Sequence, residues 1–238
     1  ITTTFAPFQT MRCCEQIKVN LGYMKQKVCM VGIASGLVLG TLGYTHCCIE
    51  DVGVLRSIPG LTIISPADSL ETVKALEAAI KFQGPTYIRL TGSSNNPIVY
   101  KKDYDFEIGK SITLKDGKDV IIFCTGAMVV ESLEAAKILD TKKISTKVIN
   151  MHTLKPIDKK AIEEACHSKL IVSVEEHNVI GGLGSAISEY KSSLENAPKQ
   201  LFLGVKDLYG KGGSYKFLLE KHRLHSEKIV EDILNFID

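Results

Sequence analysis

One histidine lies in a glycine-rich loop between an expected buried strand and a helix expected to begin near Cys47. His46 directly follows the stretch 40–45, GTLGYT, whose glycines are too frequent for a core element. Loops that leave a strand in open α/β sheets are common sites of catalysis. Histidine titrates near neutral pH, so His46 could protonate a carbonyl oxygen that gains charge during a reaction. The alternative is an ordinary surface or internally hydrogen-bonded histidine.

Two phenylalanines near the start form a second candidate group. Phe5 and Phe8 are three positions apart and so share one face of a helix expected over 6–21, where Pro7 suits the first turn. Two rings on one face could stack on a flat heterocycle. The alternative is that both rings fill the core.

A third stretch, Val174–Ser185, reads VEEHNVIGGLGS and contains His177. Its glycine turn before a helix offers free N–H groups that could bind an anion, or it is only a tight strand–helix connection.

Strands and helices must position these residues, and the two alternate along the chain. The continuous apolar run 28–33 predicts a buried strand, and 61–64 and 87–90 read as further short strands. Asp68 with Glu71 forms a capping signature for a helix over 69–82. The pattern resumes later in the chain, with expected strands at 120–124, 146–149, 170–174 and 201–205 and expected helices over 128–139, 158–166, 182–193 and 214–237. Repeated βα units with short loops require mostly parallel sheets.

The fold class predicted from this alternation is α/β, with two domains that are each a mostly parallel sheet flanked by helices. A charged stretch with a turn, 101–118, interrupts the pattern and is expected to contain one or two short strands. We therefore expect a first domain over 1–100, a connector over 101–118 and a second domain over 119–238.

The bulk composition excludes several classes of protein. The 238 residues carry a net charge of +2 with no basic run, so we expect no nucleic-acid partner. No apolar run reaches the roughly 18 residues that cross a membrane, and the start has no signal peptide. The seven cysteines lack metal-site spacing, so we expect no metal ligands in the chain, reduced thiols and a cytoplasmic protein. The missing initiator methionine suggests a fragment.

Several motifs together carry a family resemblance over essentially the whole chain. They are the TFAPF of 4–8, the loop of 40–46, the CTGA of 124–127 and the EEHNVIGGLGS of 175–185. In this combination the chain resembles the pyrimidine-binding and C-terminal domains of the transketolase family. The resemblance implies thiamine diphosphate as cofactor, with Phe5, Phe8 and Met11 around its aminopyrimidine ring. Met11 stands where relatives often carry another aromatic residue. It also implies that His46 faces the reactive carbon and contacts the substrate carbonyl.

The chain departs from the family pattern at three polar positions. Leu42 replaces an aspartate, the stretch 33–35 lacks a histidine, and the sugar-phosphate arginine is replaced near Gly92. These losses argue against an ordinary pentose phosphate as substrate. We assign substrate contacts to Arg89, the nearest arginine, although a strand side chain can point to either face. We also assign them to His177, which either reaches the rim of the site or packs between subunits.

The family's glutamate that activates the cofactor would lie before Ile1, and the diphosphate and Mg²⁺ site belongs to another domain. The resemblance therefore implies the small subunit of a split transketolase, which moves a two-carbon ketol unit between sugars. It would act with an N-terminal transketolase subunit or domain that holds the Mg²⁺, as a homodimer or heterotetramer. The alternatives are a subunit like 1-deoxyxylulose-5-phosphate synthase, one like a 2-oxoacid dehydrogenase β chain, or a non-catalytic dimerisation scaffold.

Overall fold

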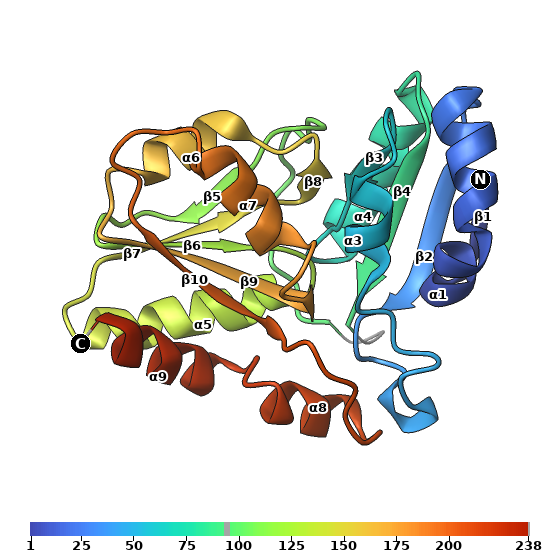
Figure 1. Cartoon of the computed structure of the whole chain (residues 1–238). Helices are drawn as coiled ribbons and strands as arrows, with labels where there is room; N and C mark the ends of the chain where they lie inside the picture. Colours follow the sequence, from blue (N-terminus) through green and yellow to red (C-terminus); the bar gives the residue numbers. More distant parts are fainter. Residues whose placement is uncertain (93–95, 238) are drawn as a thin grey trace.

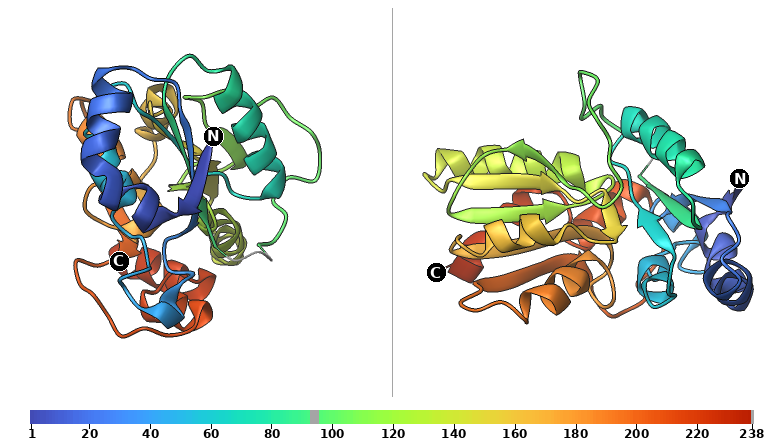
Figure 2. Two further views of the ribbon diagram at one scale, coloured as in Figure 1. Left: turned by 90° about the vertical axis from the view of Figure 1, so that its right-hand side faces the viewer. Right: turned by 90° about the horizontal axis from the view of Figure 1, so that it is seen from above.

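The computed structural model describes residues 1–92 and 96–237, which form two five-stranded sheets (Figures 1 and 2). The first sheet, in spatial order, contains β1 (Thr2–Phe5), β2 (Cys29–Ser35), β4 (Thr86–Thr91), β3 (Thr62–Ile64) and β8 (Thr153–Lys155). The second contains β10 (Lys199–Val205), β9 (Leu170–Asn178), β6 (Val120–Cys124), β7 (Thr146–Asn150) and β5 (Ile112–Lys115). Each sheet is parallel except for one antiparallel edge strand, β8 or β5. The predicted α/β class with two mostly parallel sheets is confirmed.

Helical segments cover both faces of the first sheet (Figure 2, left). One face carries α1 (Ala6–Gln9), η1 (Met11–Cys13), α2 (Cys14–Gln16), the π-helix η2 (Ile17–Tyr23) and α3 (Asp51–Arg56), and the other carries α4 (Ser69–Lys81). Because successive strand residues point to opposite faces, Ile63 and Tyr87 pack toward α3, while Ile64 and Ile88 pack toward α4. Asp68 caps α4 as predicted, since its carboxylate accepts the amide of Glu71 at 2.9 Å.

The second sheet is likewise covered on both faces (Figure 1). One face carries α5 (Met128–Thr141) and α9 (Ser226–Ile237), and the other carries α6 (Lys159–Ala165) and α7 (Leu183–Lys191). The short helix α8 (Tyr215–Lys221) lies beyond the end of β10. Every residue of β6 is buried, as expected for a central strand covered twice.

The two halves are joined by a shared core and by one strand that the second half contributes to the first sheet. One apolar cluster contains Met30 and Val52 from the first half together with Phe123 and Leu183 from the second. The strand β8, from the second half, pairs with β3 of the first sheet. These contacts fix the position of one sheet relative to the other.

Two local predictions were wrong. The helix expected near Cys47 begins at Asp51, because Cys48 first forms an antiparallel bridge with Gly36. The helix expected over 6–21 is interrupted at Thr10, whose backbone departs from regular helix geometry at φ −109° and ψ −77°. The short edge strands β1 and β8 were not predicted.

Candidate functional site

His46 lies in a loop that is closed at its base, which we call the His46 loop (residues 36–48). The amides of Gly36 and Cys48 each donate to the other's carbonyl, at 2.8 and 2.9 Å. Gly43, at φ 79°, turns the chain where a side chain would be strained. His46 is half-buried, and its Nδ1 lies 3.0 Å from the Thr45 hydroxyl. Because Nδ1 has this partner within the loop, Nε2 is the nitrogen that can reach a substrate.

The structure brings His46 and the aromatic residues of the first turn together. The Phe8 and His46 rings meet edge to face, with centroids 5.5 Å apart and planes at 70°. Phe5 lies next to Phe8, with centroids 6.2 Å apart, and is 36% exposed. Thr10 extends the link, since its hydroxyl lies 3.9 Å from the Cys48 sulfur. Met11 is 43% exposed in the turn that follows α1.

Arg12 covers one side of the Phe8 ring, a contact that the sequence analysis did not predict. Its guanidinium carbon lies 4.0 Å from the ring centroid, in a cation–π arrangement. The signal was available, because residues four positions apart meet on one helix face. A flat ligand that stacks on Phe8 must use the other face of the ring or displace Arg12.

A shallow groove of about 260 Å³ runs beside Phe8 along the edge strand β1. Thr2 and Thr4 of β1, together with Ile17 and Met30, form part of its lining. The four residues of β1 are all exposed, and the strand has a neighbour only on its β2 side. The aromatic end of the site therefore opens onto an uncovered sheet edge.

Arg89, predicted to contact substrate, is 1% exposed and is held by protein groups. Its Nε donates to both carboxylate oxygens of Asp51, at 3.0 and 2.8 Å. Its Nη2 donates to the carbonyls of Cys48 and Glu176, at 3.2 and 2.9 Å. The Tyr87 hydroxyl also donates to Asp51, at 2.7 Å. Arg89 thus holds the far end of the His46 loop from inside the protein.

His177 is buried in the same way, at 1% exposure. The Gly53 amide donates to its Nε2 at 3.3 Å, so Nδ1 carries the proton and donates to the Asn178 carbonyl at 2.7 Å. Burial, opposed by the charge of Asp51, lowers the pKa of His177 from 6.5 to about 4. The imidazole is therefore neutral at physiological pH.

The two glutamates before His177 were not assigned a role from the sequence. The Glu175 carboxylate accepts the amides of Leu183 and Gly184 at the start of α7, at 2.6 and 2.8 Å. The Glu176 carboxylate accepts the Leu37 amide at 2.6 Å and the Tyr215 hydroxyl at 2.7 Å. Burial raises the pKa of both carboxyls from 4.5 to about 7, against the hydrogen bonds that lower it.

Of the predicted site residues, Phe5, Phe8 and His46 are adjacent at the surface, and Met11 lies on the neighbouring turn. Arg89 and His177 belong instead to an internal cluster with Asp51, behind the His46 loop. Asp51 escaped the sequence analysis because an acidic residue in a first helical turn is ordinary, and nothing local shows that it is buried.

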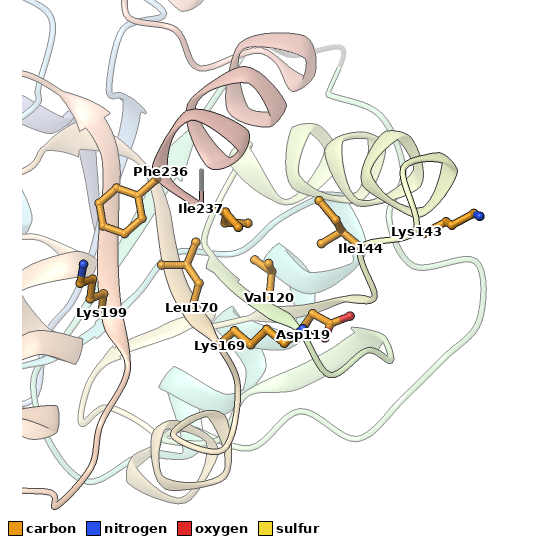
Figure 3. A pocket seen from close by; sticks show the side chains of 9 residues that line it. All are labelled: Asp119, Val120, Lys143, Ile144, Lys169, Leu170, Lys199, Phe236 and Ile237. Carbon is orange, nitrogen blue, oxygen red and sulfur yellow. Dashed lines mark ion pairs between the residues drawn. The ribbon is translucent and has the colours of Figure 1, made fainter.

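A larger cavity, of about 400 Å³, lies at the opposite end of the second sheet (Figure 3). Val120, Leu170 and Ile237 contribute apolar side chains to it (Figure 3). Lys169, at its edge, is paired with Asp119 at 3.0 Å. The cavity lies at the starts of β6 and β9, whereas Glu176 lies near the far end of β9, so it is separate from the His46 site.

Within residues 1–92 and 96–237, no three histidine, cysteine or acidic side chains gather in a way that could hold a metal ion. All seven cysteines lie in these ranges and none forms a disulfide. No helix among the described residues is both long and apolar enough to traverse a lipid bilayer.

Comparison with known proteins identifies relatives along the whole chain. The family model of the transketolase pyrimidine binding domain matches residues 1–96, and that of the transketolase C-terminal domain matches residues 109–229. A putative transketolase C-terminal section of Methanocaldococcus jannaschii is 34% identical, over 98% of this chain and 73% of its own length. A 6-deoxy-6-sulfo-D-fructose transketolase subunit of a Clostridium species is 38% identical, over 96% of this chain and 71% of its own length.

A solved structure agrees with these matches. It is described as a split gene transketolase in an inactive beta4 tetramer, and it superposes with a TM-score of 0.87 at 36% identity. The superposition covers 98% of this chain and 74% of that one.

Proposed function

Since this chain belongs to the transketolase family, we propose that it is the smaller subunit of a split transketolase and transfers a two-carbon ketol unit between sugars. The observation that carries the proposal is the edge-to-face contact between Phe8 and His46. It joins an aromatic surface for a flat ring to a group that can move a proton. Both line an open surface and not a core.

The aromatic residues fit the ring of thiamine diphosphate. Phe5 is 36% exposed and Phe8 borders the groove along β1, so both rings can be reached from outside. When bound, thiamine diphosphate supplies a carbon nucleophile for cleaving and forming bonds next to a carbonyl group. In this chain Phe8 would stack on the aminopyrimidine, Phe5 would close its side, and Met11 would pack with its flexible thioether.

His46 would serve the substrate oxygen. Thr45 holds Nδ1, which leaves Nε2 to donate to the carbonyl oxygen as negative charge builds on it. The fixed base of the loop keeps the imidazole beside Phe8, so donor and ring would act at one place. We assign Arg89 to the support of this loop and His177 to the support of α3, and neither to sugar contact, because both are almost fully buried.

A partner would complete the site. The described residues offer no metal-binding cluster, so Mg²⁺ and the diphosphate would be held by an N-terminal transketolase subunit or domain. The solved relative, a split gene transketolase, supports this division, because its beta4 tetramer is described as inactive. The assembly would be a homodimer or heterotetramer.

Within this chain, residues 1–100 would form the pyrimidine-binding part, 101–118 the connector and 119–238 the C-terminal part. The protein would work in the reducing cytoplasm, which suits its free thiols.

Calorimetry tests the cofactor role. The chain should bind thiamine diphosphate with Mg²⁺ only when the diphosphate-binding partner is present, and the complex should transfer a ketol unit from a ketose to an aldose. If the complex consumes a 2-oxoacid and not a ketose, the synthase or dehydrogenase alternative holds. If the complex forms but binds no cofactor, the chain is a scaffold.

A further inference from the structure

We propose that Glu176 is a positioning residue for His46: its carboxylate fixes the start of the His46 loop, so the second half of the chain sets the imidazole in place. The expected effect of Glu176 on turnover rests on the proposed function of His46. Its expected effect on the order of the loop rests only on the contacts described below.

The carboxylate joins three elements at one buried point. One oxygen of Glu176, near the end of β9, accepts the Leu37 amide at 2.6 Å, and the other accepts the Tyr215 hydroxyl of α8 at 2.7 Å. A charged acceptor makes stronger hydrogen bonds than a neutral one. Gly36 allows this approach, because a Cβ added there would lie 2.2 Å from Oε1 of Glu176. Gly36 also has φ +78°, which disfavours any side chain.

The other end of the loop is tied to the same residue. The Arg89 guanidinium donates to the carbonyl of Cys48, which lies two positions beyond His46, and also to the carbonyl of Glu176. The loop is thus held at residue 37 by the side chain of Glu176. At residue 48 it is held by Arg89, which also bonds the backbone carbonyl of Glu176. His46 lies inside this closed ring of contacts.

Packing shows that the loop belongs to the second half of the structure. Leu37 and Cys47 are members of the apolar cluster built around the second sheet, together with Leu218 of α8. The Gly213 amide donates to the Gly40 carbonyl at 2.9 Å, and the Tyr44 hydroxyl lies 2.7 Å from Nε2 of His222. Figure 1 and the left view of Figure 2 show this part of the chain beside α8. Among the described residues of the second half that hold the His46 loop, Glu176 is the one that contributes a carboxylate.

The ionisation of Glu176 should control the grip on the loop. Ionisable groups face it from each element packed against it: Arg89 of β4, Asp51 of α3, Cys47 of the His46 loop and Tyr215 of α8. Burial raises its pKa to about 7, while the Leu37 amide, Tyr215 and Arg89 oppose the rise. Because this pKa lies above the 4.5 of an exposed carboxyl, opening of the loop would release the proton, so the loop should be held most firmly when Glu176 is protonated and should loosen as the pH rises through 7.

Hydrogen exchange of the full-length protein, in its natural assembly, tests the anchor. Glu176→Ala leaves the Leu37 amide without its acceptor, and we expect peptides covering 36–48 to exchange about tenfold faster. Glu175→Ala is the matched control, because it removes an adjacent, equally buried carboxylate that holds α7. It should loosen 183–184 and leave 36–48 unchanged. Equal effects of the two variants on 36–48 would overturn the proposal.

The conservative variant Glu176→Gln removes the charge of the side chain and keeps its shape. It also tests the anchor if Glu176→Ala does not fold. Glu176→Gln keeps an acceptor for Leu37, so it should restore most of the protection at pH 8. Corrected for intrinsic exchange, protection of the wild-type loop should fall as the pH rises from 5 to 8, because the closed loop binds the Glu176 proton more tightly than the open loop, while that of Glu176→Gln stays flat. The same pH dependence in both proteins would contradict the proposal.

Turnover of the reconstituted enzyme shows whether Glu176 acts through His46. Glu176→Ala should lower kcat about tenfold and leave KM for the ketose within about twofold, because binding groups stay in place. In a His46→Ala background it should cause no further loss. Full additivity would exclude a positioning role. If His46→Ala alone has no effect, the proposed function fails, while the exchange experiment still judges the anchor.

Discussion

The ring of Phe8 meets the imidazole of His46 edge to face at 5.5 Å, although the two residues come from different elements of the first half. Phe8 is placed by a short helix after an edge strand, and His46 by a loop whose base is held from the second half. The contact is therefore a point where three parts of the fold meet. A change in any of them should alter the geometry there.

Replacement of His46 tests its proposed chemistry. His46→Ala should reduce kcat of the reconstituted enzyme by roughly 10²-fold or more, since it removes a group that protonates the substrate oxygen. His167→Ala provides a control, because that histidine is exposed near the start of β9. It should leave kcat within about twofold. Unaltered turnover in the His46 variant would remove this residue from the mechanism.

Replacement of Phe8 tests the aromatic surface. Phe8→Ala should weaken binding of thiamine diphosphate to the complete complex by roughly tenfold, measured by calorimetry, because it removes the stacking face. Phe236→Ala, which truncates an exposed ring at the remote cavity, should leave the affinity unchanged. If the two variants bind equally well, the cofactor does not rest on Phe8.

The buried pair of Asp51 and Arg89 should dominate the stability of the loop base. Asp51→Ala leaves the guanidinium of Arg89 buried without its carboxylate, so we expect a loss of about 3–5 kcal/mol in the free energy of unfolding, measured with urea. The control is Glu134→Ala, which breaks an exposed pair with Lys137. It should cost less than about 0.5 kcal/mol. If Asp51→Ala loses as little free energy of unfolding as this control, the buried pair does not stabilise the fold.

The pH dependence of stability should show the buried carboxyls. The folded pKa of Glu175 is about 7, raised by burial above 4.5. Its contribution is therefore fully present below pH 4.5 and is lost as the pH rises through 7. His152 and His177, whose pKa values burial lowers to about 4, oppose this trend by losing stability as the pH falls from 6.5.

A variant isolates the carboxyl contribution. Glu175→Gln cannot ionise, so its stability relative to the wild type should improve steadily between pH 5 and pH 8 in urea titrations. The constant cost of the lost acceptor for α7 does not affect this slope. A difference between the two proteins that stays constant over the range would show that Glu175 does not titrate there.

Much of the fold followed from local patterns. Continuous apolar runs identified β2 and β6, because strands covered on both faces carry no polar alternation, and mostly apolar segments identified β4 and β9. The capping pair of Asp68 and Glu71 gave the start of α4 to the residue. The edge strands β1 and β8 were missed, since they are short and their pairing is with distant segments. The interruption at Thr10 was missed because no local pattern marks the departure of this residue from helical backbone geometry.

The sequence by itself determined the kinds of chemistry available: an aromatic pair, a loop histidine and a glutamate-rich strand end, in an order that resembles one family. Only the tertiary structure decided which of these groups face outward. Arg89 and Asp51 are charged and would be expected at the surface, yet both are buried because each neutralises the other. Glu176 became the anchor of the site through contacts between residues far apart in the chain. No local pattern encodes such contacts, since folding alone brings the partners together.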